Sequence, residues 1–165
     1  MSSESSHPER AVYLSAVYAG WGEYQRMLVE AVAPLTPDHL SLRAAPTLRS
    51  IGEIAAHIIS ARVVWFHEVM GEGSDHLAPM IAWGREGDSS KRNAAELERG
   101  LERSWDMIAD ALDRWTTDDL SAGFERRGEP LTRQEIIWHV IEHDLHHGGE
   151  ISIILGQHGL RALDL

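Results

Sequence analysis

The sequence predicts an all-α, single-domain four-helix bundle over residues 1–165. Three observations support this fold class. Apolar residues recur at helical spacing in four segments, three of these segments open with a capping box, and strand signals are almost absent. No dipeptide typical of a tight hairpin lies between two alternating runs. A chain of 165 residues also suits one domain, and no internal repeat marks a boundary.

The first helix is expected to begin near Pro8 and to end at Val32. Proline is favoured at the first helical position, because its fixed φ suits a helix and its missing N–H leaves no bond unmade there. Pro34 cannot continue a helix and therefore marks its end. The apolar positions of this segment share helical spacing: Val17, Trp21, Tyr24 and Leu28.

Capping boxes predict where the other three helices begin: Ser50-Ile-Gly-Glu53, Asn93-Ala-Ala-Glu96 and Thr132-Arg-Gln-Glu135. The second helix ends near Gly71. The fourth continues to Gly159, because glycine suits the left-handed conformation just past a helix end. The second and third helices carry apolar stripes: Ile51, Ile54, Ile58, Ala61 and Trp65, then Leu97, Leu101, Trp105, Ile108 and Leu112.

The stretch Gly71–Arg92 is long for a connection within a bundle and is rich in Gly, Ser and Asp. Two arrangements are open. The connection can cross the length of the bundle, which would make the second and third helices parallel. It can also cover one end of the bundle as a lid.

The chain is acidic and contains no cysteine. Its formal charge is −11, which argues against a nucleic-acid partner, because phosphate backbones are normally met by basic patches. Without cysteine, disulfides and thiolate ligands are excluded, so any metal site must use His, Asp or Glu. Thiol chemistry would need a thiol supplied by a substrate.

No apolar run approaches the ~20 residues that a membrane span needs. The opening Met-Ser-Ser-Glu-Ser-Ser-His-Pro lacks the charged and apolar regions of a signal peptide. We therefore expect a cytoplasmic protein without a membrane partner. The six Trp are expected to fill the core, because base-stacking would need basic neighbours.

The strongest functional signal is a histidine cluster in the fourth predicted helix. His139, His143 and His147 are four residues apart and form one column on a helix. About 12 Å of helix rise separates the outer two, so one metal ion can be bound by the first pair or by the second pair, and spacing leaves that choice open. His146 points away from the column and is expected at the surface.

The obvious further ligand is His57, on the apolar stripe of the second predicted helix. A buried histidine needs a partner, and taken alone it is more often bonded to a carbonyl or carboxylate than to a metal. A His-x-x-x-His pair on a neighbouring helix favours the interpretation of His57 as a metal ligand. Three neutral imidazoles with an open fourth position are typical of a catalytic site.

A rival interpretation comes from His143-Asp-Leu-His-His147, which reads as His-Asp-x-x-His. This is one methylene short of the zinc-peptidase motif, in which a Glu serves as general base. The peptidase motif also requires a substrate groove beside a β-sheet, and the sequence predicts no sheet. The hypothesis is therefore the weaker one.

The chain resembles the DinB/YfiT-like family of metal-dependent enzymes over nearly its whole length. The resemblance is carried by Ser50-Ile-Gly-Glu-Ile-Ala-Ala-His57 and by His139-Val-Ile-Glu-His143-Asp-Leu-His-His147-Gly-Gly-Glu-Ile151. It implies a four-helix bundle with up-down-down-up topology. It also implies that His57, His143 and His147 are the metal ligands, which leaves His139 as a neighbour of the site.

The resemblance implies a divalent ion, zinc or nickel, and a small-molecule substrate. Several family members are S-transferases or isomerases that use a low-molecular-weight thiol, and homodimers are common. We therefore expect activation of a thiol or water at the three-histidine site. The alternatives are a metal-dependent hydrolase and a non-catalytic stress or interaction protein.

Two positions depart from the family pattern. Gly148 stands where an Arg is usual, which removes a cation that could hold an anionic substrate, and Glu150 stands where a Gln is usual. Glu150 lies three residues past His147 and can orient that ring by accepting its second N–H. A solvated Glu is the equally open alternative. Glu150 and Asp144 are both weak candidates for a general acid or base.

Overall fold

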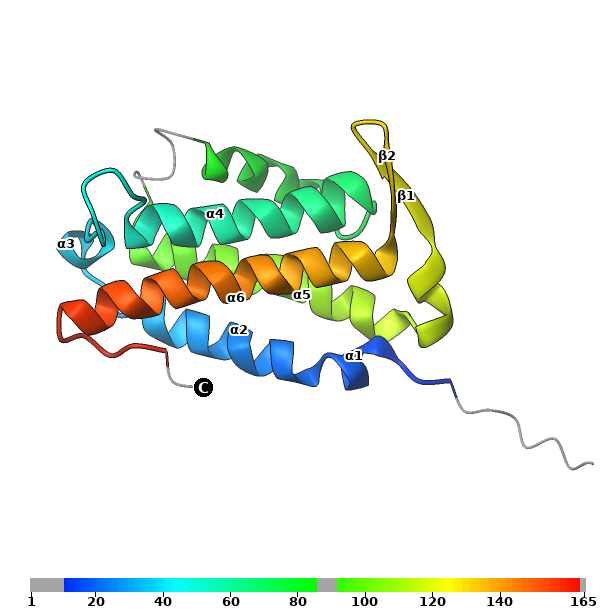
Figure 1. Cartoon of the computed structure of the whole chain (residues 1–165), viewed down its shortest axis with the longest axis horizontal. Coiled ribbons are helices and arrows are strands. Elements are labelled where there is room, and N and C mark those ends of the chain that lie inside the picture. The colour runs from blue at the N-terminus through cyan, green and yellow to red at the C-terminus, as the bar shows by residue number, and fades with distance from the viewer. Residues whose placement is uncertain (1–10, 86–91, 164–165) are drawn as a thin grey trace, which may run out of the picture.

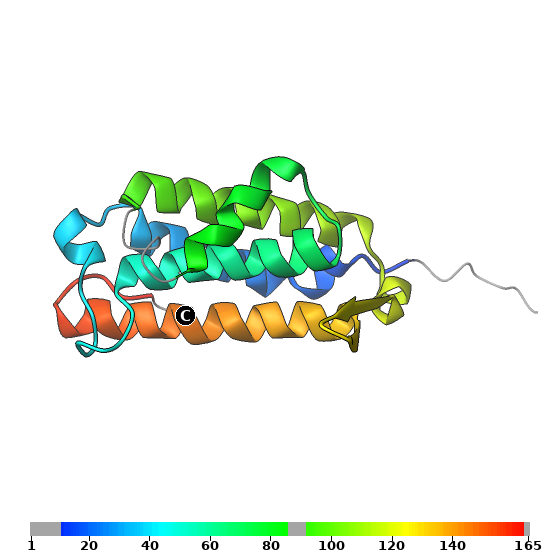
Figure 2. The same ribbon diagram turned by 90° about the horizontal axis from the view of Figure 1, so that it is seen from above.

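The computed structural model describes residues 11–85 and 92–163, and the predicted all-α bundle is confirmed. Four long rods pack side by side: α1 and α2 (Leu14–Val17 and Ala19–Val32), α4 (Ile51–Val63), α5 (Ala94–Arg114) and α6 (Arg133–Gln157). In Figures 1 and 2, α2 and α6 run in one direction and α4 and α5 in the other. This is the up-down-down-up arrangement.

The first rod begins later than predicted. The expected start near Pro8 lies outside the described residues, and residues 11–13 are not helical. Tyr13 instead forms an isolated bridge with Thr116, and the N–H of Leu14 donates to the carbonyl of Trp115 at 2.8 Å. The rod is also interrupted at Tyr18. The residues at the start of α1 are therefore held by pairing with the segment that follows α5.

All three predicted capping boxes are present. The side chains of Ser50, Asn93 and Thr132 each accept a hydrogen bond from the backbone N–H of the glutamate three residues later, at the start of α4, α5 and α6. The carboxylate of that glutamate accepts in turn from the backbone N–H of the capping residue. A further box caps the short helix α3 (Pro37–Leu40). Past the end of α6, Gly159 has φ +68°, as its predicted left-handed position requires.

The last turn of the rod formed by α4 is a π-helix, η1 (Val64–Val69), and Gly71 follows it with φ +75°. A π-turn inserts an extra residue, so the side chains on it point in directions that a regular α-helix would not give them. Apolar periodicity alone could not reveal this change. Trp65 and Phe66 lie on this turn.

The long connection after η1 crosses the bundle, and so the first of its two predicted arrangements is correct. Among its described residues is the 3-10 segment η2 (Asp75–Gly84), which packs along α4 (Figure 2). The hydroxyl of Ser60 donates to the carbonyl of Ile81 at 2.7 Å. A Cβ at Gly84 would lie 2.7 Å from that hydroxyl oxygen, so only glycine allows η2 to approach α4 this closely.

The prediction that strands are absent is wrong at one place. After a 3-10 turn, η4 (Thr117–Ser121), the chain forms an antiparallel hairpin of β1 (Gly123–Arg126) and β2 (Glu129–Thr132). Arg127 and Gly128 form its turn, with φ of +55° and +84°. Both φ values are positive, as a two-residue type I′ turn needs. Arg-Gly is not a typical dipeptide for such a turn, so the sequence signal was weak.

The apolar stripes form one core, with some exceptions among the predicted residues. Val17 is half exposed, and Ala61, Trp65 and Trp105 are only partly buried. Trp21 and Trp115 are buried as expected, whereas Trp138 is 62% exposed and does not fill the core. In the described part of the chain, no helix has the length and apolar character that crossing a membrane requires.

A buried polar cluster joins α2, α4, α5 and α6 inside this core. Arg62 and Asp144 are both fully buried and form an ion pair, with Nη2 2.8 Å from Oδ2. The indole N–H of Trp21 donates to the same carboxylate at 2.8 Å, and Nη1 of Arg62 donates to the amide oxygen of Gln25 at 2.6 Å. The amide of Gln25 in turn donates to the carbonyl of Leu101 at 3.0 Å.

Candidate metal centre

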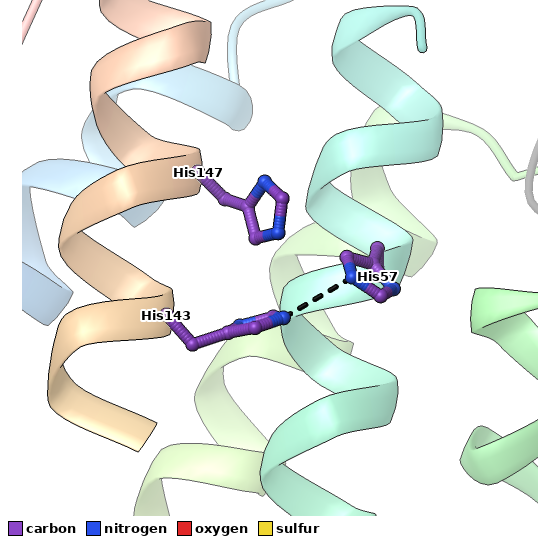
Figure 3. A group of neighbouring side chains, drawn as sticks. All are labelled: His57, His143 and His147. Carbon is purple, nitrogen blue, oxygen red and sulfur yellow. Dashed lines mark hydrogen bonds between the residues drawn. The ribbon is translucent and has the colours of Figure 1, made fainter. Parts of the chain in front are cut away.

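Three histidines from two helices converge on one point between α4 and α6. His57 lies on α4, and His143 and His147 lie one turn apart on α6 (Figure 3). The Nε2 atoms of His143 and His57 are 3.1 Å apart. One ring nitrogen from each histidine lies within 4.8 Å of the other two. We call these three residues the histidine trio.

Helical spacing left open whether His143 acts with His139 or with His147, and in the structure it is His147 that joins His143 beside His57. The rings of His143 and His147 are 4.4 Å apart, and each is 4.8 Å from the ring of His57. His139 belongs to a different contact, because its ring packs against Trp65 with centroids 4.7 Å apart. Its Nδ1 lies 3.3 Å from a carboxylate oxygen of Glu142. His139 is therefore a neighbour of the trio.

The surroundings of the trio hold its imidazoles neutral at neutral pH. Burial, followed by the nearby Arg49, lowers the pKa of His57 to about 4. Burial and the adjacent His147 lower the pKa of His143 to about 3. The pKa of His147 is also lowered by burial, against the opposing effect of Glu150. A neutral imidazole has a free lone pair, which is the form that binds a metal.

Glu150 contacts the trio from the side of α6. Its Oε2 accepts the Nδ1–H of His147 at 2.7 Å, so the other nitrogen of that ring, Nε2, is left to bind an ion. This is the orienting role predicted as one of two alternatives for Glu150. His146 is exposed, as predicted, and its Nε2 lies 3.6 Å from the other oxygen of Glu150.

The donor set fits a transition-metal ion. Two nitrogens bound at 2.0–2.1 Å to a tetrahedral ion lie roughly 3.3–3.4 Å apart, and the Nε2 atoms of His57 and His143 are already 3.1 Å apart. Imidazole nitrogens suit Zn, Ni, Cu or Fe, and the order of affinities alone does not choose among them. The arrangement can therefore hold an ion with little movement of the helices.

One atom of the trio has no partner within the described residues. Nδ1 of His143 is buried and makes no hydrogen bond there. Buried polar atoms are nearly always bonded, so this nitrogen is an exception to the rule. The trio is thus a site in which hydrogen bonding is incomplete.

Asp144 does not take part in this site, although it lies between two of the histidines in sequence. Its carboxylate points into the core and is held by Arg62 and Trp21. It can serve neither as the general base that the peptidase hypothesis needs nor as a general acid. Asp144, one of two weak acid–base candidates from the sequence, thus faces away from the trio, because one residue along a helix turns a side chain by about 100°.

The trio borders an open cleft of about 450 Å³. His57 and His143 line it on one side, and the partly buried apolar side chains of Val64, Trp65 and Ile81 line another. Three arginines also line it: Arg85, Arg126 and Arg127. These contacts could not be predicted from the sequence, because they depend on the hairpin and on the π-turn.

Packing explains why a glycine, and no larger residue, occupies position 148. A Cβ at this position would lie 2.0 Å from the phenolic oxygen of Tyr24 and 2.8 Å from its ring. Tyr24 is itself buried and its pKa is raised to about 12, first of all by that burial. The space that a longer side chain would need is therefore filled from α2.

Comparison with known proteins agrees with this fold. The model of the DinB family matches residues 7–164. A DinB-like protein from Bacillus cereus ATCC 10987 is 19% identical, with a TM-score of 0.72 over 94% of this chain and 99% of its own. A DinB-like protein from Bacillus subtilis is 18% identical, with a TM-score of 0.60 over 86% and 90%. A comparison with curated proteins finds no match.

Proposed function

The chain belongs to the DinB family, and on this basis we propose that it is a divalent-metal-dependent enzyme whose ion is held by His57, His143 and His147. The observation that supports this most directly is the convergence of three neutral imidazoles from two helices. Two histidines one turn apart on a single helix bind a metal ion weakly, whereas the ring of His57 adds a third donor from a second helix.

When bound, such an ion acts as a Lewis acid that lowers the pKa of a thiol or water toward neutrality. The residues of the chain orient and desolvate that site. Glu150 fixes the ring of His147, and the core around Asp144 and Arg62 holds α6 against α4. Three protein ligands leave a coordination position for a substrate.

The surroundings of the trio favour a thiol over water as the activated group. A thiol has a pKa near 8.5 and needs little help to ionise, whereas water usually needs a general base as well. The carboxylate in contact with the trio, Glu150, is already engaged by His147, and Asp144 faces the core. Because the chain has no cysteine, the thiol must come from a small cosubstrate.

Elemental analysis of the purified protein tests the ligand set, with zinc and nickel examined first. His57→Ala, His143→Ala and His147→Ala are each expected to abolish stoichiometric metal. His146→Ala is the matched control, because it removes a neighbouring exposed imidazole, and it should retain the ion. Stoichiometric metal in the His143→Ala variant would refute the assignment.

A thiol-dependence assay on metal-loaded protein then tests the reaction. Low-molecular-weight thiols are supplied with a model electrophile such as an epoxide or a haloalkane, and consumption of the thiol is measured. We expect turnover that needs both the metal and the thiol. Turnover of an ester with no thiol present would indicate a hydrolase, and the absence of both activities would contradict an enzymatic role.

A further inference from the structure

We propose that the cleft beside the histidine trio binds a small molecule with an anionic head group, a carboxylate or a phosphate, held by Arg126 and Arg127. This inference rests on the proposed function only for the end of the ligand that reaches the trio. The head-group site itself is argued from the hairpin and from the residues that line the cleft.

The charge of the cleft is opposite to that of the molecule. The chain carries 26 acidic and 15 basic residues, for a formal charge of −11. The cleft is lined by Arg85, Arg126 and Arg127 against one carboxylate, that of Glu68. On an acidic surface, such a local excess of cations concentrates anions at the site.

Arg126 is held in a position that suits a ligand. Its guanidinium lies over the ring of Trp65, 4.1 Å from the centroid, and the ring of His139 packs against the same indole. Stacking fixes the plane of the guanidinium but leaves the N–H groups at its edge available for a planar anion. No ion pair uses Arg126 or Arg127 within the described part of the chain.

Arg127 occupies a backbone conformation that favours glycine. Its φ of +55° is the one positive value at a non-glycine residue in the described segments. Asn, Asp and Gly are typical of this turn position, and an arginine there costs stability. The turn therefore places the long cationic side chain of Arg127 at the cleft, although its positive φ lowers the stability of the turn.

The walls next to these arginines are apolar. Trp65, Val64 and Ile81 line the same cleft, and Trp65 lies directly under the guanidinium of Arg126. The hairpin that carries both arginines adjoins the first turn of α6 (Figure 1). A matching ligand has an anionic head, an apolar body and a reacting group near His57 and His143.

Binding of three probes with the same aromatic ring tests this: phenylacetate, phenyl phosphate and the neutral phenylacetamide. Each is titrated by NMR into the protein as purified and again after chelator treatment, with the indole N–H of Trp65 as the local reporter. We expect at least one anion to bind about tenfold more tightly than the amide, as a charge-assisted hydrogen bond would provide. The better anion identifies the head group.

Two variants separate binding from folding. Arg127→Gly is expected to weaken anion binding about tenfold without lowering the melting temperature, because glycine relieves the positive φ. Arg126→Gln should weaken anion binding similarly. Arg161→Gln is the matched control, since it removes one exposed positive charge away from the cleft, and should bind as the unaltered protein does.

Equal affinity for the anions and the amide would overturn the inference, as would unchanged anion binding in both arginine variants. The outcome is independent of the proposed function. Preferential anion binding by a protein that takes up no stoichiometric zinc or nickel would refute the metal assignment alone. Stoichiometric metal without any preference for anions would refute the anion site alone.

Discussion

Two polar clusters lie next to each other on α6, and they differ in how completely their atoms are bonded. Asp144 is fully buried and accepts hydrogen bonds from Arg62 and Trp21, so its charge is matched inside the core. His143, the preceding residue, is partly buried, leaves its Nδ1 without a partner among the described residues and places its Nε2 3.1 Å from another imidazole nitrogen.

The difference shows how the same helix can serve structure on one face and chemistry on the other. A charge buried in a core must be matched, because desolvation would otherwise cost several kcal/mol. The trio avoids this cost by remaining neutral, as the lowered pKa values of His57 and His143 indicate. Each neutral ring then keeps one lone pair that an ion can bind. The predictions below test this contrast.

The largest expected effect comes from Asp144→Ala. The variant leaves the guanidinium of Arg62 buried and unpaired, so the free energy of unfolding should fall by about 3–5 kcal/mol, measured by urea denaturation. The double variant Arg62→Met with Asp144→Leu removes both charges and should recover much of this loss. A single variant as stable as the unaltered protein would show that the ion pair is not structural.

Zinc should stabilise the protein through the trio and not through the Asp144 cluster. At a free zinc concentration about a hundredfold above Kd, the free energy of unfolding should rise by about 2.7 kcal/mol. His143→Ala should abolish this gain and change the stability of the metal-free protein far less than Asp144→Ala does. Thermal unfolding with and without zinc measures both quantities. An equal gain in the His143→Ala variant would place the ion elsewhere.

Glu150→Gln should weaken zinc binding without abolishing it. The loss of an orienting carboxylate lowers metal affinity about tenfold or more, which corresponds to about 1.4 kcal/mol. Competition with a chromophoric chelator measures the change. Glu142→Gln is the control, because Glu142 contacts His139 outside the trio. If both variants lose affinity equally, the effect is one of general surface charge.

The smallest expected effect is the pH dependence of the metal-free protein. The pKa values of His57 and His143 in the folded state, about 4 and about 3, are below the ordinary value of about 6.5 for an unfolded chain. Their contribution to stability is therefore full above about pH 6.5 and is lost as the pH falls toward 4 and then 3. Solvent screening limits its size, because both rings are only partly buried.

Urea midpoints measured at a series of pH values test this sign. The free energy of unfolding should fall less steeply with decreasing pH in the His57→Ala variant than in the unaltered protein, because one protonation has been removed. Identical slopes would mean that the imidazole of His57 is solvated in the folded state.

The helices could be predicted because their signals are local. Each capping box lies within four residues, and Ser50, Asn93 and Thr132 all cap helices where expected. The hairpin was missed because its strands are four residues long and Arg127-Gly128 is an unusual pair for its turn. The π-turn around Trp65 was missed because it changes the helical register without a change in composition.

The site was predictable only in part. Spacing identified the column of His139, His143 and His147, but the choice between its two pairs came from the family resemblance. The partner of Asp144 could have been suspected, because Arg62 lies four residues after Ile58 on the buried face of α4. The stacking of Arg126 on Trp65 is a contact between distant segments, and no local pattern indicates it.

The close packing of Gly148 against Tyr24 couples two positions that are far apart in the sequence. Because a Cβ at 148 would collide with the phenol, a larger residue at 148 requires a smaller one at position 24. Gly148→Arg should therefore destabilise the protein as a single change and be tolerated better when Tyr24 is made smaller at the same time. Homologous sequences are accordingly expected to vary at these two positions together.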